Sequence, residues 1–155
     1  MADARSSRLD DLSSRVLGDS SLQSLAQVTP HMADIVRRET AKVYGQYGRV
    51  LEVGQLLDRA DIISSIAGLG LDTTVFPGFV LEALELVPKI AYGCWYIAKT
   101  KDVAAIPHWL LMESASFVPI AGEFVDLHFT YRNRARSFIV GEIVAATKRS
   151  LGVAS

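Results

Sequence analysis

The sequence predicts an all-α protein with amphipathic N-terminal helices, a kinked apolar helical hairpin in or on a membrane, and a basic amphipathic C-terminal helix. Three observations predict this arrangement. Apolar residues recur at helical spacing, with no strand-like alternation. The middle of the chain is poor in charge, and basic residues gather near its end. Hydrophobic residues make up 50% and charged residues 21% of the chain, a balance that leans apolar for a water-soluble domain.

The 155 residues are enough for one domain and too few for two independent cores. Composition divides them into a helical docking region (1–61), an apolar membrane-associated region (62–129), and a basic C-terminal helix with its tail (130–155). The net charge of −1 gives the whole chain no electrostatic reason to bind nucleic acid.

The first region is expected to consist of water-facing amphipathic helices. Leu9, Leu12 and Val16 recur at helical spacing, which predicts a short helix that ends at Gly18.

A second helix is expected to begin at Thr29 and Pro30, as an N-cap followed by proline at the first helical position. Gly45 and Gly48 are expected to weaken its end. The apolar period then continues from Arg49 to Ala67, which predicts a separate third helix.

The middle region changes in composition. Ile62–Leu81 carries one charge and is broken by glycine and proline residues. Val80–Ala98 begins with acidic residues and then runs apolar, and Pro88 is expected to kink it. Neither stretch has the roughly 18 uncharged apolar residues of a simple spanning helix. Bent helices, interfacial or re-entrant segments, and spans whose charges face protein therefore all remain open.

Aromatic residues cluster beside basic ones near a helix that is expected to start around Pro107. Such a cluster is typical of the interface between membrane and water, although ordinary core packing explains it equally well. The candidate interfacial aromatic residues are Tyr92, Trp95, Tyr96 and Trp109.

The last helix is expected to run from about Phe124 to Lys148. From Leu127 onward the chain has five basic residues and one acid. Such an excess is usually a solvated helix face, but beside an apolar segment it can also meet lipid headgroups or a protein partner. The candidate contact residues are Arg132, Arg134 and Arg136.

The segment FVPIAGEFVD, followed by aromatic and basic residues with Asn133, resembles a bacterial and protist family of small membrane-associated proteins classed as a domain of unknown function (forty-one-twelve). That family has two apolar Pro-Gly-acid motifs separated by an apolar helix pair. Pro119, Gly122, Glu123 and Asp126 match the second motif, with Glu in place of the usual Asp.

The first motif of that family is degenerate in this chain. VFPGFVLEALE keeps Pro77 and Gly78 but lacks the Gly-acid pair that should follow. The resemblance covers about Leu71–Phe138, and it implies membrane association rather than a reaction.

No arrangement of residues predicts a catalytic, metal or cofactor site, so we expect a protein that is not an enzyme. His31, His108 and His128 have no zinc-ligand spacing, and each is expected at the surface or in the core with a partner. GLGLD at 68–72 lacks the third glycine of a dinucleotide turn. Cys94 is expected to be a buried small hydrophobic residue.

Two pairs of carboxylates remain as candidate charge or ion sites. Glu82 with Glu85, and Glu123 with Asp126, are three residues apart and so share one helix face. Apolar surroundings would raise their pKa values and suit proton transfer or cation binding. Alternatively, Glu85 pairs with Lys89, and the second pair interacts with a helix dipole.

The preferred hypothesis is a non-catalytic accessory subunit of a larger membrane assembly, such as an energy-converting complex, with other subunits and membrane lipid as partners and no nucleic acid. A mitochondrial inner membrane is the expected location, and a bacterial cytoplasmic membrane is the alternative. Two other functions stay open. One is a small oligomeric transporter or ion-conducting protein, and the other is a soluble helical bundle that binds an apolar ligand.

Overall fold

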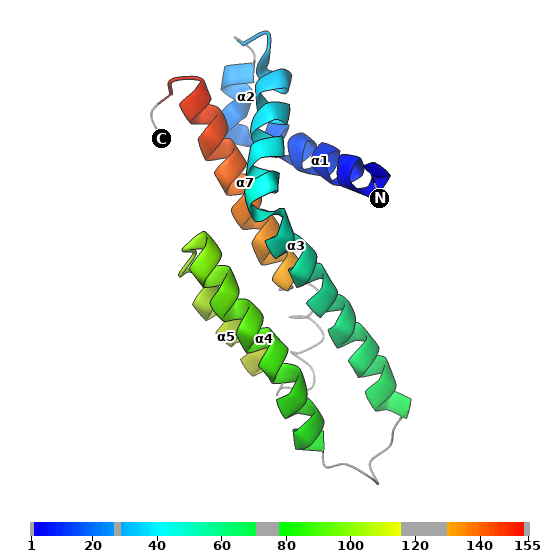
Figure 1. Ribbon diagram of the computed structural model, residues 1–155. Coiled ribbons are helices and arrows are strands. Elements are labelled where there is room, and N and C mark those ends of the chain that lie inside the picture. The colour runs from blue at the N-terminus through cyan, green and yellow to red at the C-terminus, as the bar shows by residue number, and fades with distance from the viewer. Residues whose placement is uncertain (1, 27–28, 71–77, 116–129, 154–155) are drawn as a thin grey trace. The chain divides into compact units, whose positions relative to one another are not determined.

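The computed structural model describes residues 2–26, 29–70, 78–115 and 130–153 (Figure 1). No strand occurs in these residues, which confirms the predicted all-α class. Across these ranges, no helix combines the length and the apolar composition that crossing a membrane requires. The described helices are α1 (Ala2–Leu17), α2 (Ser20–Ala26), α3 (Met32–Gly70), α4 (Gly78–Thr100), α5 (Ala105–Ala115) and α7 (Tyr131–Ser150).

Contacts divide the chain into two compact units. The first unit is Met1–Gly48 with Arg136–Ser155, and the second is Arg49–Ala135. The long helices α3 and α7 each contribute one segment to each unit. The three regions predicted from composition stay a prediction.

The first unit has an aliphatic core from α1, α2, α3 and α7. As predicted, α1 stops just before Gly18, whose N–H donates to the carbonyl of Ser14 at 3.0 Å. A helix is also present after Thr29, but it begins at Met32 and not at Pro30 as expected, after a turn in which the N–H of Met32 donates to the Thr29 carbonyl at 3.2 Å. The buried aliphatic residues of this unit are Leu12, Val16, Leu22, Met32, Val36, Val43, Ile139 and Ile143.

Polar contacts tie the helices of this unit together. Ser13 donates to Thr40 at 3.2 Å, and both side chains are buried. Glu39 on α3 accepts hydrogen bonds from Lys42 at 3.0 Å and from Ser150 of α7 at 3.1 Å. Burial by itself raises the pKa of Glu39, but the bonds from Lys42 and Ser150 outweigh it and lower the pKa. Glu39 is therefore a charged link between α3 and the end of α7.

The expectation that the chain breaks after Gly48 is wrong, because α3 runs unbroken over 39 residues. Gly48 and Gly54 within α3 allow close packing instead of ending the helix. A Cβ atom at Gly48 would lie 2.9 Å from the ring of Tyr44. A Cβ atom at Gly54 would lie 2.9 Å from the hydroxyl of Tyr92 and 3.3 Å from the backbone nitrogen of Arg132.

The predicted start of the last helix at Phe124 is also wrong. Thr130 is not helical, and α7 begins at Tyr131. Thr130 acts as the N-cap, since its hydroxyl accepts from the N–H of Asn133 at 3.0 Å. The carboxylate of Asp58 on α3 accepts from the N–H groups of Tyr131 at 3.0 Å and Arg132 at 3.1 Å. Three N–H groups that a helix start leaves open are thus satisfied, and negative charge lies where the helix dipole favours it.

Pro88 lies inside α4, as the sequence predicted, and the expected kink there stays a prediction.

Alanine substitutions at two α3 glycines test this packing. Gly54→Ala is expected to lower the free energy of unfolding by about 1–3 kcal/mol, because the new methyl group overpacks against Tyr92 and α7. Gly45→Ala is the matched control: a Cβ atom at Gly45 meets nothing within 4 Å, so alanine should raise stability by about 0.5–1 kcal/mol. Urea unfolding measures both, and a stabilising Gly54→Ala would contradict the packing.

Candidate functional site

Aromatic rings from α4, α5 and α7 form the core of the second unit. The ring centroids of Tyr92 and Tyr131 are 5.5 Å apart, and those of Tyr96 and Trp109 are 5.0 Å apart, both in edge-to-face geometry. This geometry is favoured by the ring quadrupoles. All four side chains are buried. Core packing, which was left open above, therefore describes Tyr92, Tyr96 and Trp109.

The two buried tyrosines of α4 also have hydrogen-bond partners. The hydroxyl of Tyr92 donates to the backbone carbonyl of Val50 on α3 at 3.0 Å. The hydroxyl of Tyr96 donates to Asp102 at 2.8 Å. Burial raises the pKa of both tyrosines, so both hydroxyls remain protonated donors. These bonds turn one face of α4 toward α3 and toward the start of α5.

The turn between α4 and α5 is held by an ion pair. Arg134 of α7 donates from Nε at 2.9 Å and from Nη2 at 2.6 Å to the two oxygens of Asp102. The Asp102 side chain is only 10% exposed, so this two-pronged pair is largely shielded from water. Lys101, at φ 61°, reverses the chain just before it. Asp102 thus accepts bonds from both Tyr96 and Arg134, which suits a structural role.

The exposed side of α4 has the opposite polarity to the exposed side of a water-facing helix. Between Leu86 and Ala98, every exposed residue is uncharged, while the buried side carries the hydroxyls of Tyr92 and Tyr96. A surface helix normally turns its apolar stripe inward and its charges outward. The exposed residues of this segment are Leu86, Val87, Pro88, Ile90, Ala91, Cys94, Trp95 and Ala98.

The turn into α5 and the first half of α5 repeat this pattern. All exposed residues from Val103 to Leu111 are apolar, and Val103 and Leu110 keep 63% and 66% of their surface accessible. Figure 1 shows α4 and α5 side by side, and a Cβ atom at Gly93 would lie 3.2 Å from the Trp109 ring. We call the exposed residues of Leu86–Ala98 and Val103–Leu111 together the α4–α5 apolar face.

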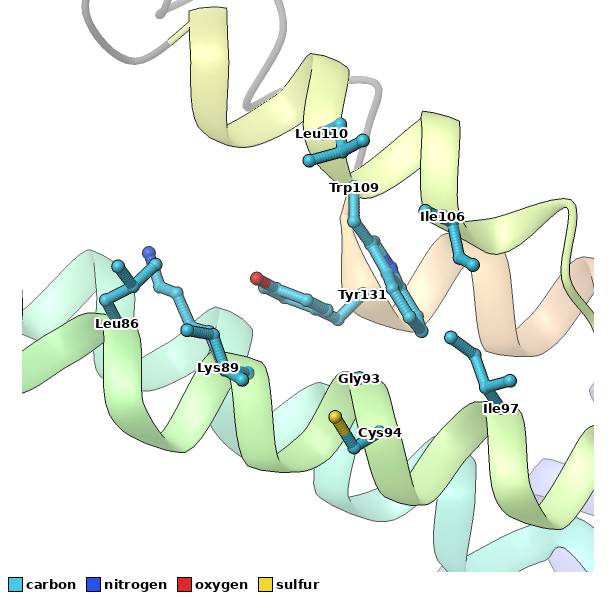
Figure 2. A pocket seen from close by; sticks show the side chains of 10 residues that line it. Leu86, Lys89, Gly93, Cys94, Ile97, Ile106, Trp109, Leu110 and Tyr131 are labelled. Carbon is cyan, nitrogen blue, oxygen red and sulfur yellow. The ribbon is translucent and has the colours of Figure 1, made fainter.

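A pocket of about 330 Å³ lies within this face (Figure 2). Most of the residues that line the pocket are apolar. They belong mainly to α4 and α5, and Tyr131 of α7 completes the lining. Figure 2 shows the rings of Trp109 and Tyr131 on the side of the pocket opposite α4. The residues of α4 in the lining are Leu86, Lys89, Ile90, Gly93, Cys94 and Ile97.

Basic residues border the face. Lys89, Lys99 and Lys101 are the cations between Leu86 and Leu111, and the one acid in this segment is Asp102, which is paired with Arg134. Three lysines and one acid thus belong to this segment.

Cys94 was predicted to be buried, which is wrong, because it is exposed. Cys94 lies on the side of α4 opposite the buried Tyr92 and Tyr96. Trp95, the remaining predicted interfacial aromatic residue, is 38% exposed and lies at the edge of the same face.

The three candidate arginines differ in their surroundings. Arg134 is committed to Asp102, which makes it part of the fold. Arg132 is exposed, and Arg136 is partly buried. Of the three, Arg132 keeps the surface position expected of a headgroup or partner contact.

The predicted carboxylate sites lie beyond what the structure describes. Glu82 and Glu85 belong to α4, but their side chains are outside the description, and Glu123 and Asp126 lie in the undescribed stretch 116–129. These four residues stay a prediction. The described residues contain no group of three or more His, Cys, Asp or Glu side chains that could hold a metal ion.

A comparison of the chain with protein families, with curated proteins and with solved structures finds no match. The resemblance to the family of small membrane-associated proteins therefore stays a prediction. Function has to be inferred from the surface and the pocket themselves.

Sequence reasoning did not single out Asp58 or Asp102. Their partners lie far along the chain, 73 residues away for Asp58 and Tyr131 and 32 for Asp102 and Arg134. Only Asp102 stands out in the local sequence, because this acid follows Lys99 and Lys101 at the end of an apolar helix.

The pH dependence of stability tests the surroundings of His108. Burial, together with the positive charge of Arg134, lowers the pKa of His108 from its usual value of 6.5. The unfolded chain then takes up a proton before the folded one, so stability is full above pH 6.5 and falls as the pH drops below it. Urea unfolding between pH 7.5 and 5.5 should show this loss.

His108→Gln should make that profile flatter, because glutamine takes up no proton. His31→Gln, at an exposed position, is the matched control variant for the same substitution. An equal slope in the His108→Gln protein and the wild type would contradict the assignment.

Proposed function

We propose that the protein is a non-catalytic component that associates with a membrane surface through the α4–α5 apolar face. The observation that carries the proposal is the reversed polarity of α4, whose exposed side between Leu86 and Ala98 has no charge. Large exposed apolar patches mark surfaces that meet another apolar phase.

The rest of the second unit supports this view, because its other surfaces are ordinary. On α3, Arg49, Glu52 and Arg59 are exposed, and Arg132 is exposed on α7. Within the described residues of this unit, 86–98 and 103–111 carry no exposed charge, whereas Lys99 and Lys101 between them are exposed. An ordinary water-facing surface also exposes some apolar side chains, but it exposes charged side chains among them.

The composition of the border favours a lipid surface over a purely apolar protein surface. Lysines near anionic headgroups contribute about 1 kcal/mol each, and this attraction is screened by salt. Tryptophan is favoured at the interface between lipid and water, because its indole ring is apolar and its N–H group is polar. Lys89, Lys99 and Lys101, with Trp95, supply both features.

Membership in a larger membrane assembly stays part of this proposal, with residues 1–61 as the docking region for other subunits. The transporter alternative depends on Glu82, Glu85, Glu123 and Asp126, whose side chains are outside the described residues. The alternative of a helical protein that binds an apolar ligand is favoured by a specific observation, the pocket within the face.

Co-sedimentation with vesicles tests the proposal. The wild-type protein is expected to bind vesicles that contain phosphatidylglycerol more strongly than vesicles of phosphatidylcholine alone, and to release them as salt rises. A variant with both Ile90→Asp and Leu110→Asp should lose at least about tenfold in partitioning, since each buried aliphatic side chain contributes about 1.5–3 kcal/mol.

Leu56→Asp is the matched control. Leu56 is 61% exposed and lies in the same unit, but on α3 outside the face. It should bind vesicles like the wild type. Wild-type protein that stays in the supernatant at low salt, or equal losses in the control and the double variant, would contradict the proposal.

A further inference from the structure

We propose that the pocket in the α4–α5 apolar face binds one uncharged aliphatic chain, such as that of an alkanol, through apolar contacts alone. The inference goes beyond the proposed function and does not depend on it, since a chain can reach the pocket from water as well as from lipid. The binding part of the pocket is the stretch from Ile90 to Ile97 on α4, with Ile106, Trp109 and Leu110 of α5.

Four lining residues of α4 form a continuous stripe along this stretch. They follow one another at three- and four-residue spacing and so share one side of the helix. At the helical rise, the stripe is about 10 Å long. Figure 2 shows the lining residues of α5 across from it, so a ligand between the two helices has apolar groups on both sides. The residues of the stripe are Ile90, Gly93, Cys94 and Ile97.

The volume of the pocket fits a single chain. Small-molecule sites in proteins are commonly about 300–1,000 Å³, and this pocket, at about 330 Å³, lies at the small end. An apolar cavity of about 150 Å³ holds one benzene molecule, so there is room for roughly twice that amount of hydrocarbon. Because the lining extends along a helix and does not close around one point, the space favours a chain over a compact ring.

The polar groups of the lining leave a charged ligand without support. Nearly all of the surface that the described residues present to the pocket belongs to apolar atoms. The indole N–H of Trp109 is buried, and Lys89 already interacts with another group of the chain. A charged group that lost its water here would not be compensated by these residues, and such a loss costs free energy. The pocket therefore selects an uncharged chain.

Cys94 provides the readout. It is the only cysteine of the chain, it is exposed, and it lies within the stripe. A chain in the pocket would cover its thiol. The rate of alkylation by N-ethylmaleimide, followed by mass spectrometry of the intact full-length protein, thus reports occupancy without a label on the ligand.

The first experiment uses hexanol, octanol and decanol below their solubility limits, with no vesicles present. Each should slow alkylation of Cys94, and affinity should rise about fourfold per added methylene, the factor that corresponds to about 0.8 kcal/mol. Glutathione with the same alkanols shows whether they affect the reagent itself. Absence of protection by all three alkanols would overturn the proposal, as would protection that does not depend on chain length.

Two comparisons test the class of ligand. Octanol should protect Cys94 more strongly than cyclooctanol, which has the same number of carbons in a compact ring. Decanol should protect at least as strongly as decanoate, because the pocket does not support a charge. Equal or stronger protection by cyclooctanol would contradict the chain, and stronger protection by decanoate would contradict the uncharged class.

Ile90→Asn tests the site itself. It places a polar amide in the stripe, and affinity for decanol should fall about tenfold, because contact with a buried aliphatic side chain accounts for a factor of that order. Val87→Asn is the matched control. Val87 is also exposed on the α4 side of the face, at 66% against 56% for Ile90, but it does not line the pocket. Equal losses in the two variants would overturn the site.

The same two variants separate the pocket from the membrane surface. Each removes one apolar side chain from the α4–α5 apolar face, so vesicle binding should weaken to a similar extent in both, whereas only Ile90→Asn should weaken the binding of decanol. Protection of Cys94 without vesicle binding would leave the pocket as a ligand site and remove the membrane surface. Vesicle binding without protection would do the reverse.

Discussion

The hydrogen bond from the Tyr92 hydroxyl to the backbone carbonyl of Val50 is the interaction on which the second unit depends. Both faces of α4 are apolar enough to be buried, so apolar contacts alone do not select the rotation of this helix about its axis. A buried hydroxyl without a partner costs free energy, and Tyr92 finds its acceptor only when it faces α3. Gly54 makes the approach possible, because any side chain there would collide with that hydroxyl. This rotation turns the aliphatic side of α4 outward.

The remaining contacts of the unit extend the same constraint. Tyr96, one turn further along α4, donates to Asp102, and Asp102 holds Arg134 of α7. Since a largely shielded carboxylate is costly unless it is paired, the turn after α4 is fixed together with the start of α7. Trp109 of α5 packs against Tyr96 and Gly93 of α4, so α5 also exposes its aliphatic residues. The apolar face thus follows from the hydrogen bonds that Tyr92, Tyr96 and Asp102 make in the interior, and not from a loosely packed core.

Helical periodicity, together with the signals at Gly18, Thr29 and Pro30, was enough to predict the fold class, the end of α1 and the presence of a helix after Thr29, although that helix begins only at Met32. It failed at Gly48, where the low helix propensity of glycine was outweighed by tight packing against Tyr44. It also failed at the start of α7, because the Asp58 carboxylate that caps this helix comes from a residue 73 positions earlier. Which side of α4 is buried was beyond the sequence for a similar reason, since the acceptor for Tyr92 is a backbone carbonyl 42 residues away. The aromatic residues were noticed, but their division into the buried Tyr92, Tyr96 and Trp109 and the exposed Trp95 required the fold.

Quenching of tryptophan fluorescence by brominated lipids tests the membrane-facing role of the α4–α5 apolar face most directly. The chain has two tryptophans, so Trp109→Phe leaves Trp95 at the edge of the face as the only fluorophore, and Trp95→Phe leaves the buried Trp109. With vesicles that carry bromine on their acyl chains, the account predicts strong quenching of Trp95 and much weaker quenching of Trp109. Equal emission from Trp95 with brominated and with ordinary vesicles, under conditions in which the protein is bound, would show that another surface meets the lipid and would contradict the account.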